Sequence, residues 1–467
     1  MEKDKQSQRG LKNRHIQIIA IAGTIGTGLF LGAGKSIHLT GPSIIFVYLV
    51  IGAMMYVLLR AIGEMLYTDT EQHSFLNFVS RYLGKKTGYF AQWSYWLVVV
   101  FMAMAELTAV GTYLQLWLPN VPTWLTEPVI LLLLFLLNTL NSKFFGETEF
   151  WFGIIKVAAI FGMIATAIIM LFGHFSYPAT SFVSSTGTDT IKAGSASLAN
   201  IWRDFSFMPN GSSNFFASFQ MVMFAFVGME FIGMTAAETE NPRPTLKKAI
   251  RQIPVRILIF YIGALLAIMA ILNWRDIPVG QSPFVMVFNL IGIKWAAMLI
   301  NFVVLTSAGS ALNSALFSTS RNLYSLSTIN KDKLMTPFTR LSKSGIPLNA
   351  LIFTTILILL TPFIPLIPGQ AFADAFTLVT AVSTNLFIVV YVLTLITYLR
   401  FRRSKDFDPS GFKTPAPNVL VPLSILGFIL IFLSLFFFKD TMVAAIGTVI
   451  WIVIFGFVSS LHKEKDL

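Results

Sequence analysis

The stretch GTIGTGLFLGAGKS, residues 23–36, places five glycines inside an apolar segment and ends in Gly-Lys-Ser. A phosphate-binding loop has the pattern G-x-x-x-x-G-K-[ST], which would need a glycine where this chain has Leu29. The dinucleotide pattern G-x-G-x-x-G also fails, because its third glycine would fall on Leu31 or on Ile37. We therefore expect no nucleotide at this stretch, and its glycines need another explanation.

The composition indicates a membrane protein, because 55% of the residues are hydrophobic and only 12% are charged. Soluble domains carry about 25% charged residues. A helix needs roughly 20 apolar residues to cross a membrane. The sequence predicts an all-α polytopic membrane protein with about 12 transmembrane helices, the first of them a retained span and not a signal peptide. The spans centre on residues 16–38, 42–64, 88–117, 126–142, 150–173, 213–237, 252–273, 294–322, 348–367, 371–399, 417–437 and 440–461.

The distribution of basic residues predicts the orientation in the membrane. The formal net charge is +12, and most Lys and Arg residues fall in four stretches, 3–14, 243–256, 321–343 and 400–413. By the positive-inside rule these stretches and both termini are cytoplasmic, in a multi-pass protein of the cell membrane. Anionic lipid accounts for the basic charge, so we expect the lipid bilayer and no nucleic acid as a partner. The chain has no cysteine, and no histidine cluster suggests a metal site.

The glycines of the first span have two explanations. One is a helix-packing seam formed by Gly23, Gly28 and Gly32, because small residues let backbones approach closely. The other is a discontinuous helix, in which free N–H groups at a break bind a carboxylate and unwound carbonyls accept from an ammonium group. The break would expose Ile25, Gly26, Thr27 and Gly28 to an α-amino acid.

A second interruption favours the discontinuous helix. Five spans later the chain reads MVMFAFVGMEFIGMTAAETENP, residues 221–242, with Gly228 and Gly233 on either side of the acidic Glu230. Transporters with inverted repeats carry matching interruptions in corresponding spans of two five-helix halves, and they bind substrate between them.

Several motifs together resemble the amino acid transporter family of bacterial permeases, within the amino acid/polyamine/organocation superfamily. They are Asn-Arg-His at 13–15 before GTIGTGLF at 23–30, GPS at 41–43, GETEFWFGIIK at 146–156, AAETENP at 236–242 and SALFSTSRNLYSLS at 314–327. Within the family, NRHIQIIAI, GPSIIFVY, FGETEFWF and NFVVLTSA look most like the permeases for D-serine, D-alanine and glycine.

This resemblance implies a five-plus-five inverted repeat (LeuT-like) with broken helices 1 and 6, two C-terminal helices, and amino acid uptake driven by protons. The expected organisation is a cytoplasmic tail at 1–15, a first repeat at 16–173, an extracellular loop at 174–212 and a second repeat at 213–400. A cytoplasmic loop at 401–415, the last two spans at 416–461 and a tail at 462–467 follow. Residues 74–84 are expected to form an amphipathic helix on the inner surface.

Three buried charges are candidates for proton coupling, because a charge in the membrane costs about 3 kcal/mol on insertion scales. The ammonium group of Lys156 either extends to the inner membrane interface or occupies the place where sodium-driven relatives of this fold bind a cation. In the second case it would link the first span to Ser307 or Ser310, and the resemblance supports this role. Glu106 either forms a structural pair, for example with Lys156, or serves coupling or the substrate's ammonium group. Glu230 either carries a proton and shapes the pocket or satisfies freed backbone N–H groups.

The other candidates surround these charges. Aromatic side chains either form the pocket or its lid or simply pack, and helical hydroxyls often bond to their own turn. Glu64 and Glu238 either form gating ion pairs with loop arginines or are solvated. The remaining candidates are Phe224, Phe226, Trp96, Tyr95, Ser383 and Thr384.

The sequence predicts a proton-coupled secondary permease for small neutral amino acids such as glycine, D-alanine and D-serine, with L-alanine and L-serine included if the pocket accepts both hands. No cofactor is expected, and the failed phosphate loop argues against an ATP-driven pump or a membrane enzyme. The alternatives are a permease for lysine, 4-aminobutyrate or an aromatic amino acid, an exchanger, and a transporter-like sensor.

Overall fold

The computed structural model of this chain describes residues 24–70, 72, 74–140, 145–184, 187–203, 205–231, 241–277, 279, 281–292, 294–330, 335–342, 345–366, 372–408 and 411–461. In the first part of the chain the elements are α3 (Thr27–Phe30), α4 (Gly32–Thr40), the 3-10 turn η1 (Gly41–Ser43), α5 (Ile44–Thr68), α6 (Leu76–Leu83), α7 (Lys85–Leu114), α8 (Thr123–Leu140) and α9 (Phe145–Phe172).

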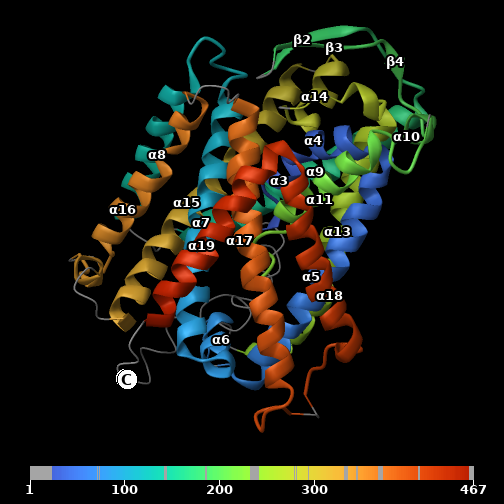
Figure 1. The fold of residues 1–467 in the computed structure, drawn as a ribbon. Helices are drawn as coiled ribbons and strands as arrows, with labels where there is room; N and C mark the ends of the chain where they lie inside the picture. Colours follow the sequence, from blue (N-terminus) through green and yellow to red (C-terminus); the bar gives the residue numbers. More distant parts are fainter. Residues whose placement is uncertain are drawn as a thin grey trace.

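A region of short elements follows, with β1 (Ser176–Tyr177), β2 (Thr180–Ser184), β3 (Gly187–Ile191), β4 (Gly194–Ser195) and α10 (Ala199–Trp202). The second half contains α11 (Gly211–Ala225), α13 (Pro242–Ile271), η3 (Trp274–Asp276), α14 (Pro283–Leu290), α15 (Lys294–Asn330), η4 (Thr336–Thr339), α16 (Leu348–Ile358), η5 (Thr361–Leu366), α17 (Phe372–Phe401), α18 (Pro417–Ser434), η6 (Leu435–Phe437) and α19 (Lys439–Leu461). Figure 1 shows these helices as one bundle.

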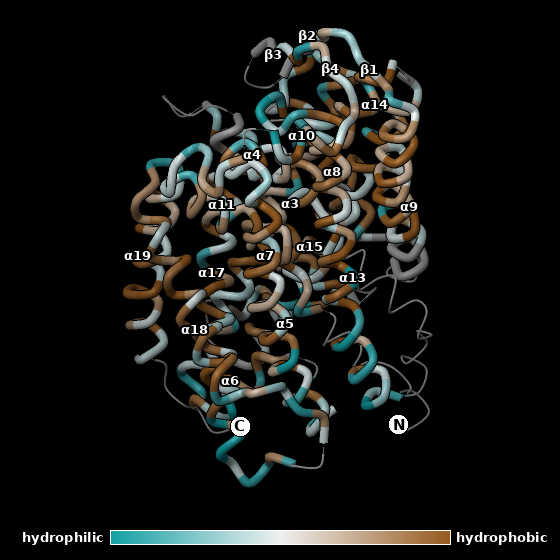
Figure 2. The backbone as a smooth tube through the Cα atoms, turned by 90° about the vertical axis from the view of Figure 1, so that its right-hand side faces the viewer, coloured by the Kyte–Doolittle hydropathy of each residue, from teal (hydrophilic) through white to brown (hydrophobic). Residues whose placement is uncertain are grey.

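The helices have the length and apolarity of membrane spans. Within the described residues, nine helical segments are long and apolar enough to cross a membrane, and α8 adds a shorter apolar helix at Thr123–Thr139. Figure 2 shows hydrophobic residues along the middle of the bundle and hydrophilic residues toward its two ends. The prediction of an all-α polytopic membrane protein is confirmed. Among the described residues, the predicted spans at 16–38 and 213–237 coincide only with the shorter helices α3, α4 and α11, so the number of about 12 spans stays a prediction.

Burial separates interior helices from peripheral ones. In α7 and α17, 72% of the apolar stretch is buried, whereas the corresponding figures for α18 and α19 are 28% and 22%. The side chains that α18 and α19 expose are mostly large and aliphatic or aromatic, as expected for surfaces that face lipid chains. Helices α7 and α17 are therefore interior helices, and α18 and α19 lie at the periphery of the bundle.

The two ends of the bundle carry different small elements (Figure 1). At one end, β1 pairs with β4 and β2 pairs with β3, each as an antiparallel ladder. The sequence analysis expected an extracellular loop at 174–212 and did not foresee these ladders. We call this end the ladder end and the opposite one, where α6 lies, the α6 end.

Helix α6 is the amphipathic helix that was predicted over residues 74–84, and it ends at Gly84, whose φ of 96° suits glycine. Polar contacts tie it to two loops. Arg81 lies 3.1 Å from Asp69 and 3.0 Å from Asp406, measured from its guanidinium nitrogens to the nearest carboxylate oxygens. The Tyr82 hydroxyl donates to Asp406 over 2.7 Å. Burial, together with this bond, raises the pKa of Tyr82 to about 12, so the hydroxyl keeps its proton at neutral pH.

Aromatic side chains fasten the last helix, α19, to α7. The Trp451 indole N–H donates to Ser94 Oγ over 3.0 Å. The ring of Phe455 stacks on that of Trp451 at 4.4 Å between centroids and on that of Tyr89 at 5.8 Å. Such pairs add about 0.5–1.5 kcal/mol each beyond their buried area. Helix α19 is thus attached to an interior helix although most of its own surface is exposed.

Candidate functional site at two interrupted helices

The first span is interrupted between Ile25 and Thr27. Gly26 has an extended backbone, with φ −135° and ψ −159°, and α3 begins only at Thr27. The amides of Leu29 and Phe30 both donate to the Gly26 carbonyl over 3.2 Å, which marks the first turn of the new helix. The N–H groups at the very start of a helix, which here come before Leu29, have no acceptor within their own helix. The predicted break near residues 25–28 is therefore present.

A carboxylate lies at the start of α3. The hydroxyl of Thr27 donates to Glu106 Oε1 over 3.1 Å. A methyl group on Gly26 would lie 3.2 Å from that oxygen. The second oxygen, Oε2, has no hydrogen-bond partner among the described residues. Glu106 thus occupies the positive end of the helix, where negative charge is stabilised.

Lys156 and Ser307 approach the same interruption. Lys156 is 3% exposed on α9 and interacts electrostatically with Glu106. On α15, Ser307 donates to the Ile25 carbonyl over 3.4 Å. Ser310 is also buried on α15, and its predicted contact with Lys156 stays a prediction. The structure therefore brings both charges and one of the two predicted hydroxyls to the break.

The second interruption follows α11, which ends at Ala225. Residues 226–230 form turns, and Gly228 has a φ of 93°, a conformation that favours glycine. Glu230 is fully buried there and accepts from the Tyr391 hydroxyl at 2.7 Å, from the Gly228 N–H at 3.1 Å and from the Tyr95 hydroxyl at 3.4 Å. Its carboxylate thus satisfies a freed N–H group, one of the two roles expected for it.

The two interrupted helices touch along the glycines of the first. A methyl group on Gly28 would lie 2.5 Å from the Cα of Ala225, and one on Gly32 would lie 2.7 Å from the sulfur of Met221. The discontinuous helix is therefore present together with a packing seam at Gly28 and Gly32, although the two were weighed as alternatives from sequence; Gly23, the third glycine of the predicted seam, lies outside the described residues. Gly28 serves the seam between the two interruptions, because its missing side chain lets the backbones meet.

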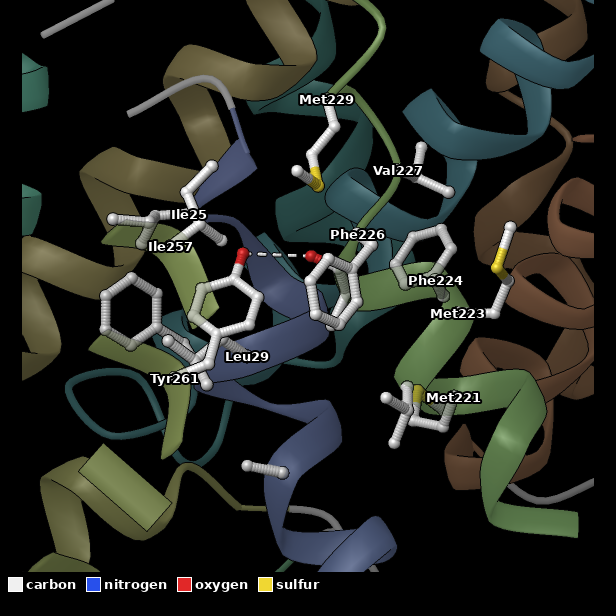
Figure 3. Close-up of a cluster of buried hydrophobic side chains, with 14 of the residues drawn as sticks. Ile25, Leu29, Met221, Met223, Phe224, Phe226, Val227, Met229, Ile257 and Tyr261 are labelled. Carbon is white, nitrogen blue, oxygen red and sulfur yellow. Dashed lines mark hydrogen bonds between the residues drawn. The ribbon is translucent and has the colours of Figure 1, made fainter. Parts of the chain in front are cut away.

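Two phenylalanines flank the end of α11, Phe224 in its last turn and Phe226 just after it. Phe226 is fully buried, and its ring lies 5.7 Å from that of Tyr48 and 5.4 Å from that of Tyr261. The ring of Phe224 meets Phe376 edge-on at 6.3 Å. Figure 3 shows this cluster around Ile25 and the residues that follow α11. These rings pack the second interruption against α5, α13 and α17.

Sequence reasoning missed Tyr261 on α13. Its hydroxyl oxygen lies 2.6 Å from the Thr24 carbonyl oxygen and 2.9 Å from that of Ala225, so it reaches both interruptions. It is the only side chain with a hydrogen-bonding group in the run ILIFYIGALLAIMAI, residues 257–271. That signal is weak, because a tyrosine in an apolar helix is more often a packing residue or an interface anchor.

The other predicted pocket residues have different neighbours. The Trp96 indole donates to the Thr319 carbonyl over 3.1 Å, which ties α7 to α15. The Ser383 hydroxyl donates to the Val98 carbonyl over 3.3 Å, and Thr384 accepts from Gln220 over 3.4 Å. These contacts join helices, so among the described residues Tyr95 is the one lid candidate with a hydrogen bond at an interruption.

Glu64 and Glu238 were expected either to form ion pairs with loop arginines or to be solvated. The side chain of Glu64 is 2% exposed, so simple solvation is wrong for it. It accepts from the Tyr398 hydroxyl at 2.7 Å and from the Thr414 N–H at 2.6 Å, and Arg402 lies 3.9 Å away. The expected pairing with a loop arginine is thus present. Glu238 lies outside the described residues.

Comparison with known proteins identifies the family. A family model described as amino acid permease matches residues 15–467. The chain belongs to the amino acid permease family. This permease is 69% identical over 98% of its length to the DL-alanine permease SerP2 of Lactococcus lactis subsp. cremoris (strain MG1363), covering 96% of that protein.

Two further relatives have related names. The serine permease SerP1 of the same strain is 60% identical, and the match covers 99% of this permease and 99% of SerP1. The D-serine/D-alanine/glycine transporter of Escherichia coli (strain K12) is 41% identical, with 97% of this permease and 93% of that protein covered. These relatives are named as permeases or transporters, not as enzymes. The resemblance stated from sequence motifs is confirmed, and the permease is a multi-pass membrane protein.

Proposed function

We propose that this permease imports small neutral amino acids across the cell membrane together with protons, by alternating access, and that alanine of both hands is a principal substrate. The observation that carries the proposal is the start of α3, where a broken helix opens beside a second break and binds a carboxylate of the protein itself. An α-amino acid presents such a carboxylate with an ammonium group two bonds away. Helix starts bind anions, and freed carbonyls accept from cations.

Access to the break supports substrate binding at Gly26. Of residues 24–30, Gly26 alone is partly exposed, and the others are buried. The substrate carboxylate would bind the first-turn N–H groups of α3 at Gly26, Thr27 and Gly28. The Thr24 and Ala225 carbonyls share the single hydrogen of the Tyr261 hydroxyl, so they keep lone pairs that could accept from the ammonium group, as could the acidic groups near the breaks.

The expected size of the substrate follows from the second interruption and from the relatives. Tyr95, Phe224 and Phe226 are nearly or fully buried there and held by partners, which leaves little room for a large side chain. The most similar relatives described above are named for alanine, serine and glycine. Glycine, alanine and serine are therefore favoured over lysine, 4-aminobutyrate and aromatic amino acids.

Glu106 and Lys156 supply the proposed coupling. The charged Glu106 carboxylate occupies the end of α3 that the substrate carboxylate needs. Protonation of Glu106 removes that competing charge, so binding of the proton and binding of the substrate favour each other. Lys156, which interacts with Glu106, balances the charge when the proton leaves. Glu230 shapes the second interruption and remains a further candidate for carrying a proton.

The test uses purified protein in liposomes with an imposed inward proton gradient. Labelled D- or L-alanine should accumulate, and an uncoupler should abolish the gain. Glu106→Gln keeps a hydrogen-bonding side chain but cannot titrate, so it should exchange alanine without gradient-driven accumulation, and Lys156→Ala should do the same. Glu127→Gln is the matched control, because Glu127 is buried on α8 and has no hydrogen-bond partner among the described residues.

Other outcomes separate the alternatives. Accumulation that ignores the proton gradient would indicate an exchanger. Binding without any flux would indicate a sensor, and a requirement for ATP would overturn the proposed class. Full proton-driven accumulation by Glu106→Gln would remove Glu106 from the coupling step.

A further inference from the structure

Tyr261 is the one side chain described above whose hydroxyl reaches both interrupted spans. It lies on α13, is fully buried, and places its hydroxyl oxygen 2.6 Å from the Thr24 carbonyl oxygen and 2.9 Å from the Ala225 carbonyl oxygen. Figure 3 shows it among Ile25, Leu29 and Phe226. A residue from a third helix thus connects the two breaks.

Both carbonyls need an external donor. Thr24 is the helical residue just before the first break, and Ala225 is the last residue of α11. The final carbonyls of a helix have no partner in their own ladder, and leaving one buried without a donor is costly. A hydroxyl has a single hydrogen, so Tyr261 donates to one carbonyl at a time or shares the hydrogen between both. If the two carbonyls move apart, the hydroxyl can follow only one of them, and the other loses this donor.

The surroundings of Tyr261 fix where its hydroxyl lies. Its ring meets that of Phe226 at 5.4 Å and that of Tyr48 edge-on at 5.8 Å between centroids. Tyr48 is equally buried, yet its own hydroxyl has no hydrogen-bond partner among the described residues. The two neighbouring tyrosines therefore differ in their hydroxyl groups. That of Tyr261 donates to the carbonyls at the breaks, and that of Tyr48 does not.

We propose that Tyr261 is a positioning residue that holds the two interruptions in register and so sets the spacing between the ammonium-binding and carboxylate-binding groups. This inference rests on the proposed function. A fixed spacing selects α-amino acids against β-amino acids, in which one more methylene separates the two charged groups. Tyr261 acts through the backbone of both breaks and need not touch the substrate.

The test compares Tyr261→Phe with the matched control Tyr48→Phe, since each removes one hydroxyl from the same aromatic cluster. Uptake of labelled alanine is measured in competition with unlabelled alanine and with β-alanine. In Tyr261→Phe the preference for alanine over β-alanine should fall about tenfold, as expected for the loss of one buried hydrogen bond. Tyr48→Phe should keep the wild-type preference.

The ratio distinguishes positioning from a merely structural role. A purely structural loss would weaken the binding of alanine and of β-alanine equally and leave the preference for alanine unchanged. That result would overturn the assignment. A wild-type protein that accepts alanine and β-alanine equally would also overturn it. If Tyr261→Phe does not purify as a monodisperse protein, Tyr261→His takes its place. The shorter histidine side chain cannot place a hydrogen-bond donor between the Thr24 and Ala225 carbonyls. The same fall of about tenfold in the preference for alanine over β-alanine is therefore expected.

Failure of the proposed function gives a different result. If the wild type moves no alanine, the function proposed above fails. If the wild type transports alanine and rejects β-alanine, and Tyr261→Phe keeps that preference, only the role of Tyr261 fails.

Discussion

Adding one methyl group at Gly28 should separate the two interrupted helices. The new carbon would lie 2.5 Å from the Cα, 2.8 Å from the nitrogen and 3.0 Å from the Cβ of Ala225. Carbon atoms that are not bonded normally stay about 3.5–4.0 Å apart. Because the obstacle includes backbone atoms, no rotamer change relieves it, and α3 must move away from α11 by about 1 Å.

The expected effect of Gly28→Ala is large on transport and smaller on folding. Overpacking costs about 1–3 kcal/mol, and alanine returns about 1 kcal/mol of helix propensity relative to glycine. A displacement of about 1 Å at a binding site costs up to roughly 100-fold in rate. We therefore expect a folded protein whose alanine uptake falls about 10- to 100-fold.

The neighbouring glycine supplies the control. In Gly32→Ala the methyl group would meet Met221, 2.7 Å from its sulfur and 3.0 Å from its Cγ, which belong to a flexible side chain that can rotate away. Uptake of labelled alanine in cells, with the amount of folded protein measured by fluorescence-detected size exclusion, compares the two. Wild-type uptake and affinity in Gly28→Ala would refute the reasoning, as would equal loss in both variants.

Three further variants test single contacts, and two of them concern the buried carboxylates Glu230 and Glu64. Tyr391→Phe removes the 2.7 Å hydrogen bond to Glu230 and should lower alanine uptake severalfold. Trp96→Phe removes a hydrogen bond to the α15 backbone and should lower thermal stability more than substrate affinity. Kinetic constants from uptake assays distinguish these effects, and unchanged kinetics in Tyr391→Phe would contradict the first. Glu64→Gln replaces the charged acceptor of two short bonds beside Arg402 and should cost about 1–3 kcal/mol, seen as a lower thermal midpoint of the purified protein. An unchanged midpoint would show that the charge of Glu64 contributes nothing to stability.

The sequence predicted the interruptions because glycine marks them directly. Gly26 takes the extended conformation and Gly228 the positive φ that end the helical ladders, and both stood out in apolar spans. The buried charges were also predictable, since Glu106, Lys156 and Glu230 are costly in a membrane unless they have partners or a role. The inverted relation of the two halves and the orientation of the termini stay predictions.

Other features depend on contacts between distant segments, which one sequence does not reveal. Tyr261 is a lone tyrosine in an apolar run, and only the fold brings it to Thr24 and Ala225. Glu127 escaped notice because it lies at the edge of its predicted span, yet it is buried against Gly111. The β-ladders escaped because their short strands are rich in serine, threonine and glycine and carry little alternation.

The attachment of α19 to α7 determines what a reporter on the last helix would measure. The Trp451 and Phe455 side chains bind to the face of α7 that carries Tyr89 and Ser94, so a tilt of one helix must carry the other. A spectroscopic probe placed on the lipid-facing side of α19 would therefore follow the third span without altering any residue near Glu106. Removing the final helix to shorten the protein would strip α7 of its aromatic support and expose a new apolar surface to the bilayer.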